Sequence, residues 1–332
     1  MLVSDIGLKF HLHYIDTKLT MMSYFTGKST IMNMLASSLT PEHGQISLGG
    51  VPLTENDTSA DHLYSQGSIS YCAQFDALFA KKTVNEHIRF YSDVRGLDWK
   101  SDVTRNHLES IIQLLGLTKH REKQSTELSG GYKRRLCLAI ALIGHPKVLL
   151  LDECTTGLDP AARHLVWNVL KPESRNDSYD IPAILLSSHY MDECQHLGTR
   201  IGIMIDGELV ATGSLNRLRE LYCTGLFVEI ALQSKLVMDC KKAEQQVIAA
   251  FAKIDMEASI YETLPFHFKL KVNFQQGVII GNNTTQLAEA FRLLETNKIE
   301  LAIQFYAISL MNLEQIFIDL SRKQFKASDD EW

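Results

Sequence analysis

The 332-residue sequence lacks a surplus of positive charge and lacks long apolar runs. With 33 basic and 39 acidic residues it carries a net charge of −6, which gives no electrostatic reason to expect nucleic acid as a partner. The longest uninterrupted apolar runs are about as long as residues 136–143, far short of the ~18 to 20 residues that span a bilayer. A role at a membrane would therefore require transmembrane segments outside this sequence.

Cysteine spacing argues against a metal cluster, and the amino-terminal residues argue against a signal peptide. The six cysteines are scattered without the CxxC or CxxH spacing of a metal cluster, which favours a reducing compartment. Charged side chains such as Lys9, Asp16 and Lys18 interrupt the apolar residues near the amino terminus, so no signal peptide is predicted. With 45% hydrophobic residues and a mean hydropathy of −0.06, the chain has room for one large globular domain and a smaller one.

The most informative stretch is 128–159, which reads LSGGYKRRLCLAIALIGHPKVLLLDECTTGLD. Ser129–Gly131 is a turn with little side chain at the start of a predicted helix, where backbone amides and the helix dipole can face an anion. The unbroken apolar run 148–151 predicts a parallel strand that is buried on both faces. That strand delivers Asp152 and Glu153 to its carboxyl end, where ligands bind in open α/β sheets.

Two adjacent carboxylates at such an edge can divide the work of hydrolysis. Asp152 can hold a hydrated Mg²⁺, and Glu153 can polarise an attacking water. The alternative is a solvated acidic pair at a strand end, which would be favoured if the pair stood alone. The Ser-Gly-Gly turn and the helix that precede the pair favour the catalytic interpretation.

This succession of motifs resembles the ATP-binding domain of ABC transporters. In that family LSGG is the signature motif, the acidic pair is Walker B and Thr156–Asp159 is the D-loop. Gly27–Thr30, with sequence GKST, resembles the end of a Walker A loop, in which the lysine meets the β/γ-phosphates and the hydroxyl binds Mg²⁺. Residues 44–50 resemble the antiparallel β-subdomain of the family, and the apolar spacing of 83–117 predicts its helical subdomain.

Two further polar residues match family loops. Gln74, in the sequence YCAQFDAL, resembles the Q-loop glutamine, whose amide can contact Mg²⁺ or the lytic water. His189 follows a predicted buried strand and resembles the H-loop histidine, which can hydrogen-bond the γ-phosphate and hold the base and water in line. Taken alone, an ordinary loop glutamine and a structural histidine are the simpler alternatives. The QFDAL sequence is similar to the A subfamily, whose members move lipids.

The first half of the Walker A loop departs from the family pattern. Met22 and Phe25 stand where the family has glycines, which supply positive φ and close backbone approach to phosphate. The adenine-stacking aromatic residue of the family would lie before Met1, so the amino-terminal edge is expected to be truncated or to come from a faulty gene model. We therefore expect the two ATP sites of a paired assembly to differ. The signature turn of this chain would contact ATP bound to a partner domain, whereas its own loop would bind nucleotide weakly.

The carboxyl-terminal third has a different pattern. From residue 222 the apolar residues indicate elements in the order β-α-β-β-α-β, which is ferredoxin-like in type, and they include no catalytic constellation. Residues 308–317 resemble the end of the regulatory domain that follows the second ATPase domain of A-subfamily transporters. A basic cluster on the signature helix, formed by Lys133, Arg134 and Arg135, is predicted to be a solvated face, with a phosphate or acidic neighbour as the alternative.

The expected fold is an α/β P-loop NTPase of ABC type, with a RecA-like core, an antiparallel β-subdomain and a helical subdomain, followed by a small ferredoxin-like α+β domain. The expected boundaries are 1–221 for the ATPase domain, 222–325 for the regulatory domain and 326–332 for a disordered tail.

The resemblance implies Mg-ATP hydrolysis coupled to lipid transport at the cytoplasmic face of a membrane. The implied partners are a second ABC ATPase domain, paired head to tail, and transmembrane domains on another chain or in a missing part of the polypeptide. A soluble ABC-type ATPase and a non-hydrolysing regulatory module are the alternatives. The implied residues are, for catalysis, Glu153, His189 and Gln74; for ATP, Gly27, Lys28, Ser29, Thr30, Ser129, Gly130, Gly131 and Asp159; and for Mg²⁺, Ser29, Gln74 and Asp152.

Overall fold

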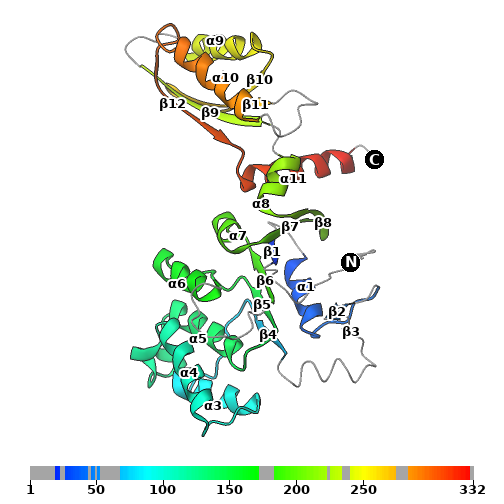
Figure 1. Ribbon diagram of the computed structural model, residues 1–332, viewed down its shortest axis with the longest axis vertical. Coiled ribbons are helices and arrows are strands. Elements are labelled where there is room, and N and C mark those ends of the chain that lie inside the picture. Colours follow the sequence, from blue (N-terminus) through cyan, green and yellow to red (C-terminus); the bar gives the residue numbers. More distant parts are fainter. Residues whose placement is uncertain are drawn as a thin grey trace. The chain divides into compact units, whose positions relative to one another are not determined.

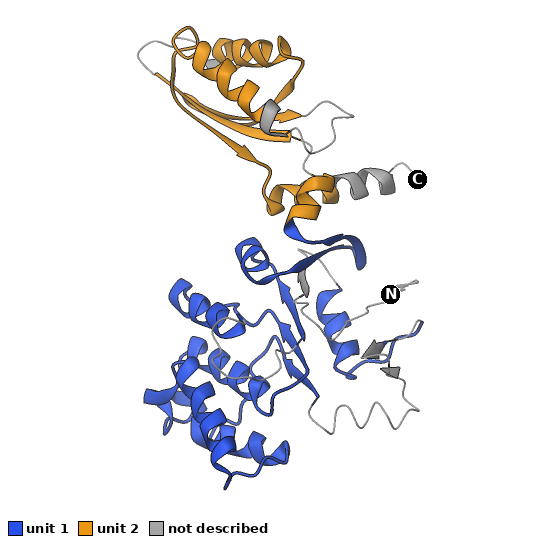
Figure 2. Cartoon of the chain, in the orientation of Figure 1, with its two compact units in different colours: residues 1–215 blue, residues 216–332 orange. Residues whose placement is uncertain are grey.

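The computed structural model describes residues 19–22, 27–43, 46–48, 51–52, 68–171, 183–222, 225–233, 240–273 and 283–329. The chain divides into two compact units, residues 1–215 and 216–332 (Figure 2). Each unit has its own sheet and its own hydrophobic core.

The first unit is built on a six-stranded sheet in the order β4-β5-β6-β1-β7-β8 (Figure 1). Strands β4, β5, β6, β1 and β7 pair in parallel, whereas β8 pairs with β7 antiparallel. The strands are β1 (Leu19–Met22), β4 (Ile69–Cys72), β5 (Val148–Asp152), β6 (Ala183–Ser188), β7 (Arg200–Ile205) and β8 (Glu208–Gly213). A separate antiparallel pair consists of β2 (Ser47–Leu48) and β3 (Val51–Pro52).

Helices cover both faces of the parallel strands (Figure 1). They are α1 (Lys28–Leu35), α3 (Val84–Val94), α4 (Asp102–Leu114), α5 (Gly130–Leu142), α6 (Pro160–Leu170) and α7 (Met191–Leu197), with short 3-10 turns at Thr118–His120 and Ser125–Glu127. Alternate residues of β5 enter different cores: Leu149 and Leu151 pack with α3 to α6, and Val148 and Leu150 pack with α1. Burial on both faces explains why the sequence of β5 is the unbroken apolar run from which this strand was predicted.

Local signals set the start of two helices near the site. Thr83 caps α3 through a capping box, in which its hydroxyl accepts from the amide of Glu86 and the Glu86 carboxylate accepts from the amide of Thr83. Asp159 caps α6, and Pro160 occupies its first turn, where a missing amide hydrogen has no consequence.

The second unit contains a four-stranded antiparallel sheet in the order β10-β11-β9-β12. Its elements follow one another in the β-α-β-β-α-β order that the apolar pattern predicted. After α8 (Leu215–Tyr222), which starts at the unit boundary, they are β9 (Gly225–Leu232), α9 (Cys240–Ala252), β10 (Glu257–Leu264), β11 (His267–Asn273), α10 (Asn283–Thr296), β12 (Ile303–Leu310) and α11 (Leu313–Asp329). Apolar residues of α9 and α10, including Val247, Phe251 and Leu294, pack on the sheet in one core.

One boundary differs from the sequence expectation. Helix α11 continues to Asp329, so the predicted disorder from residue 326 is wrong for 326–329, and residues 330–332 lie outside the described residues. The segment after 320 contains no proline or glycine and is rich in lysine, arginine, glutamine and alanine, which are good helix formers despite their polarity. In the described part of the chain, no helix combines the length and apolar character needed to cross a bilayer.

Candidate active site

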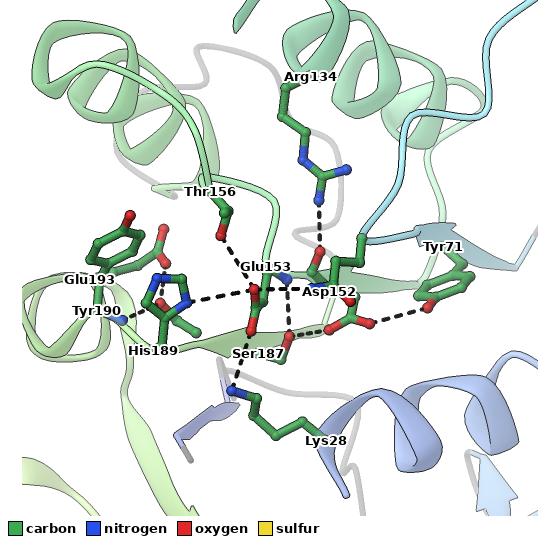
Figure 3. Close-up of polar contacts among 12 residues, drawn as sticks. Lys28, Tyr71, Arg134, Asp152, Glu153, Thr156, Ser187, His189, Tyr190 and Glu193 are labelled. Carbon is green, nitrogen blue, oxygen red and sulfur yellow. Dashed lines mark hydrogen bonds and ion pairs between the residues drawn. The ribbon is translucent and has the colours of Figure 1, made fainter. Parts of the chain in front are cut away.

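Polar side chains from four separate segments meet at the carboxyl edge of the parallel sheet (Figure 3). Glu153 follows β5, His189 follows β6 and Gln74 lies just beyond β4, while Lys28 opens α1 after β1. Because neighbouring parallel strands end on the same edge, residues far apart in the sequence come together there.

Glu153 is the centre of this cluster. The Lys28 ammonium lies 3.4 Å from its Oε1, and the His189 Nδ1 lies 3.6 Å from its Oε2. The Gln74 amide and the Thr156 hydroxyl each donate to Oε2, both at 3.4 Å. Sequence reasoning placed Lys28, Gln74, Glu153 and His189 in one site, and the structure brings these four side chains together.

The environment of the Lys28–Glu153 pair is largely closed to water. The side chains of Lys28 and Glu153 are 9% and 16% exposed. Shielding of this kind strengthens the Coulombic attraction between the two charges relative to that of a pair on an open surface. An anion entering the site would therefore compete with Glu153 for a cation that is already positioned.

The backbone at Glu153 is held in an uncommon conformation. Its φ of 47° lies in the left-handed region, which a non-glycine residue adopts at a cost. The amide of Glu153 donates to the Ser187 carbonyl at 3.2 Å and lies 3.0 Å from the Ser187 hydroxyl oxygen. These contacts turn the chain sharply after β5 and aim the carboxylate at Lys28 and His189.

Asp152 is fixed by two hydroxyl groups. It is 1% exposed, and its oxygens accept from the Ser187 hydroxyl and, at 3.4 Å, from the Tyr71 hydroxyl. Burial and the charge of Asp152 raise the pKa of Tyr71 to about 12, so the phenol remains a proton donor. The Tyr71 oxygen also lies 3.2 Å from Asn33 Oδ1, on α1.

The donors at this edge fit Mg²⁺. Among the described residues, no group of three or more histidine, cysteine or acidic side chains is placed to hold a metal ion. Asp152 and Gln74 at this edge, and Ser29, the residue after Lys28 in α1, instead carry oxygen atoms of the kind that Mg²⁺ prefers. Mg²⁺ is commonly held by one or two carboxylates together with water and substrate phosphates.

Gly27 is required by the geometry at the start of α1. Its φ is 118°, and a Cβ there would lie 3.1 Å from the Gly207 Cα and 3.2 Å from the Met204 Cε. Gly27 takes the N-cap position of α1 without a side-chain cap, and Ser29 and Thr30 lie in the first turn. Ser23, Tyr24, Phe25 and Thr26, in the preceding part of the Walker A-like loop, lie outside the described residues.

The Ser129–Gly131 turn faces away from the protein interior. Ser129 and Gly130 are exposed, and Ser129 caps α5 without a side-chain hydrogen bond. Asp159 accepts from the Ala162 amide at 2.8 Å. In the described part of the chain, no hydrogen bond or ion pair joins this turn or Asp159 to Glu153. The start of α5 is therefore open to solvent and is not joined to the cluster.

Sequence reasoning missed several residues that hold the site. Arg134 corrects the prediction of a solvated face, since it is 4% exposed. Its spacing with Leu138 and Leu142, on the buried side of α5, was the signal that could have found it. Tyr71 and Ser187 were missed because their role depends on strand pairing, in which Ser187 lies opposite Asp152.

Glu193 was missed for the same reason. Its carboxylate is fully buried and accepts from the Trp167 indole at 2.9 Å and from the Ser188 hydroxyl. The Ser188 oxygen in turn accepts from the Tyr190 amide at 3.0 Å. Glu193 thus fixes the residues on both sides of His189 (Figure 3).

Comparison with known proteins identifies the fold of the first unit. A protein-family model with the description ABC transporter matches residues 26–156. The structure of the ATP binding subunit of an ABC transporter is 22% identical, with a TM-score of 0.54, and the match covers 62% of this chain and 82% of that chain. The dimeric structure of a bacterial ABC transporter cassette is 21% identical, with a TM-score of 0.53, over 60% of this chain and 85% of that chain. The predicted P-loop NTPase fold of ABC type is confirmed.

Curated relatives are similar over both units. The human cholesterol transporter ABCA5 is 30% identical over 302 residues, 90% of this chain and 17% of its own length. The human glucosylceramide transporter ABCA12 is 33% identical over 301 residues, 90% of this chain and 11% of its own length. The human retinal-specific phospholipid-transporting ATPase ABCA4 is 31% identical over 310 residues, 91% of this chain and 12% of its own length. The chain thus spans 11 to 17% of these relatives. The chain therefore contains an ABC transporter ATP-binding domain, and the relatives that match nine tenths of its length include members of the A subfamily.

Proposed function

We propose that this chain is an ATP-binding and ATP-hydrolysing part of an ABC transporter of the A subfamily. The observation that carries the proposal is the meeting of Lys28, Gln74 and His189 at the Glu153 carboxylate, next to the buried Asp152. A cation, a base and polar positioning groups at the carboxyl edge of a parallel sheet are the parts that triphosphate hydrolysis requires.

The residues divide the chemistry as follows. The Lys28 ammonium binds the β/γ-phosphate oxygens of ATP and exchanges its contact with Glu153 for a contact with phosphate. Glu153, released from that pair, accepts the proton of the attacking water. His189 and Gln74 border the same carboxylate and orient the water and the γ-phosphate.

A magnesium ion is the second proposed cofactor. Bound Mg²⁺ would neutralise charge on the phosphate oxygens. Asp152 would hold it through water, since both carboxylate oxygens already accept hydroxyl hydrogen bonds, and the Ser29 hydroxyl and Gln74 amide are the other proposed ligands. Gly27 and Thr30 belong to the same phosphate-binding turn.

We further propose that the chain works in a head-to-tail pair with a second ABC ATPase domain. The exposed Ser129 and Gly130, with Gly131, would contact ATP held by the partner, and Asp159 would lie at the same junction. The chain's own loop would bind ATP weakly, because Met22 and Phe25 replace glycines. Titration of the purified chain with ATP tests this: tight binding that is lost in Lys28→Ala would contradict the asymmetry.

The transport step is assigned to other polypeptide segments. Hydrolysis would drive lipid movement by transmembrane domains, with this chain at the cytoplasmic face of the membrane and nucleic acid not involved. The relatives named for cholesterol, glucosylceramide and phospholipid support a lipid substrate. The second unit would be a ferredoxin-like regulatory domain, beginning near residue 222.

Steady-state ATP hydrolysis by the chain mixed with a partner ATPase domain that lacks its own catalytic base tests the function, because only the site built on Lys28 and Glu153 can then hydrolyse ATP. Glu153→Gln should reduce turnover by roughly 10²- to 10⁴-fold, the usual contribution of a general base. Glu109→Gln is the matched control, since Glu109 lies on α4 and pairs with Arg121. Equal rates for the wild type and Glu153→Gln would instead support a non-hydrolysing regulatory module.

A further inference from the structure

Arg134 is a buried charge at the junction of three segments. It lies in the second turn of α5, and its guanidinium makes hydrogen bonds to main-chain carbonyls on two sides. Nη2 donates to the Asp152 carbonyl at 2.6 Å, Nε donates to the Cys154 carbonyl at 3.0 Å and Nη1 donates to the Ala73 carbonyl at 2.5 Å. Figure 3 shows the side chain reaching from its helix to Asp152. Asp76 completes the set, with its Oδ1 3.6 Å from Nη1.

These carbonyls belong to residues adjacent to Glu153 and Gln74, the two proposed catalytic residues. Asp152 and Cys154 flank Glu153, and Ala73 precedes Gln74. Because Glu153 has a φ of 47°, the peptide groups on both sides of it must be held against relaxation toward a more favourable conformation. Charge-assisted hydrogen bonds to both neighbouring carbonyls provide that restraint.

The planar guanidinium is suited to this task. It presents several N–H donors in a fixed fork, so one side chain can bind carbonyls from two segments that are about eighty residues apart in the sequence. A lysine ammonium is a single point charge and cannot reproduce that geometry. Burial of an arginine at this depth is costly, and the carbonyls and Asp76 compensate for it.

We propose that Arg134 is a positioning residue that holds Glu153 and Gln74 in a fixed relative position for ATP hydrolysis. This inference rests on the proposed function for the roles of Glu153 and Gln74. The restraint itself is a property of the chain without nucleotide.

Hydrogen–deuterium exchange of the full chain without nucleotide measures the restraint directly. Arg134→Lys and Arg134→Met should each raise exchange in residues 73–77 and in 152–157 by roughly tenfold, since the shared charge-assisted bonds are lost. Arg95→Met is the matched control, because Arg95 is another arginine of this unit whose guanidinium bonds to Ser70, on β4. Arg134→Lys retains the positive charge and keeps the test valid if Arg134→Met does not fold. Unchanged exchange in both segments of a folded Arg134→Lys chain would overturn the proposal.

Kinetics separate positioning from a purely structural role. With a partner ATPase domain present, Arg134→Lys should lower kcat by roughly tenfold or more and change KM by less than about threefold, because Lys28 still binds phosphate. An unchanged kcat, or an equal loss in Arg95→Met, would contradict positioning. Absence of hydrolysis in both the wild type and Glu153→Gln would contradict the proposed function instead, and the exchange result would still decide whether Arg134 restrains the two segments.

Discussion

At the scale of single residues, the site depends on the groups that hold Asp152 and Glu153 in position as well as on these two acids. Ser187 illustrates this, because its hydroxyl donates to Asp152 and its oxygen lies 3.0 Å from the Glu153 amide. One buried hydroxyl therefore holds the Asp152 carboxylate and the Glu153 main chain, and its removal should affect both residues.

Ser187→Ala should destabilise the chain by about 1 to 3 kcal/mol, because it leaves the buried Asp152 carboxylate without one of its donors. Chemical denaturation of the variant and the wild type measures the difference. Ser110→Ala is a suitable control, since the bond of Ser110 to the Asn106 carbonyl lies on the exposed side of α4. A cost equal to that of the control would show that the hydroxyl does not hold Asp152.

Gly27 is the residue at which backbone conformation matters most for the start of α1. Gly27→Ala should destabilise the chain by about 1 to 3 kcal/mol, since it places a Cβ at positive φ against Gly207 and Met204. Gly130→Ala is the comparison, because a Cβ there meets no atom within 4 Å. Equal denaturation midpoints for the two variants would contradict this account of Gly27.

At the scale of elements, buried polar bonds connect the helices to the turns that carry the site. Trp167 on α6 donates to Glu193 on α7, and Glu193 accepts from Ser188 at the end of β6. The position of His189 therefore depends on α6 and α7 as well as on β6.

Trp167→Phe should remove the indole donor and leave the buried Glu193 carboxylate partly unsatisfied, at a cost of about 1 to 3 kcal/mol. Trp99→Phe provides the control, since Trp99 is partly exposed and is contacted by Arg89. Unfolding free energies from denaturant titration give both values. A Trp167→Phe cost no greater than the control would exclude a supporting role for the indole.

His87 links α3 to the segment that follows β4. Its Nδ1–H donates to the Thr83 carbonyl at 2.7 Å, and its Nε2 accepts from the Phe79 amide at 2.9 Å. The bond that Nε2 accepts requires the neutral ring, and burial lowers the pKa of His87 below its usual 6.5. The unfolded chain therefore binds this proton more tightly, so the stabilising contribution is complete above pH 6.5 and is lost as the pH falls below it.

Thermal melts at several pH values test this link. Between pH 7.5 and 5.0 the wild-type Tm should fall more steeply than that of His87→Gln, which has no titrating ring. Parallel pH profiles for the two chains would show that the His87 ring does not couple these segments.

At the scale of the whole molecule, the elements that periodicity controls were predictable and their arrangement was not. The apolar run of β5 and the helical spacing of apolar residues in α3 and α4 follow from local sequence. The placement of β1 between β6 and β7 depends on pairing between distant segments, which a single sequence does not encode locally. Arg134 was misassigned for a related reason: charged residues are usually exposed, and only the folded chain supplies the carbonyls that compensate for its burial.

The central claim concerns the chemistry of Glu153, and single-turnover hydrolysis of ATP bound to the paired ATPase domains tests it most directly. In Glu153→Gln, bound ATP should be retained and its cleavage should slow by roughly 10²-fold or more, because the general base is gone while Lys28 still binds phosphate. Cleavage of bound ATP by Glu153→Gln at the wild-type rate would contradict the account.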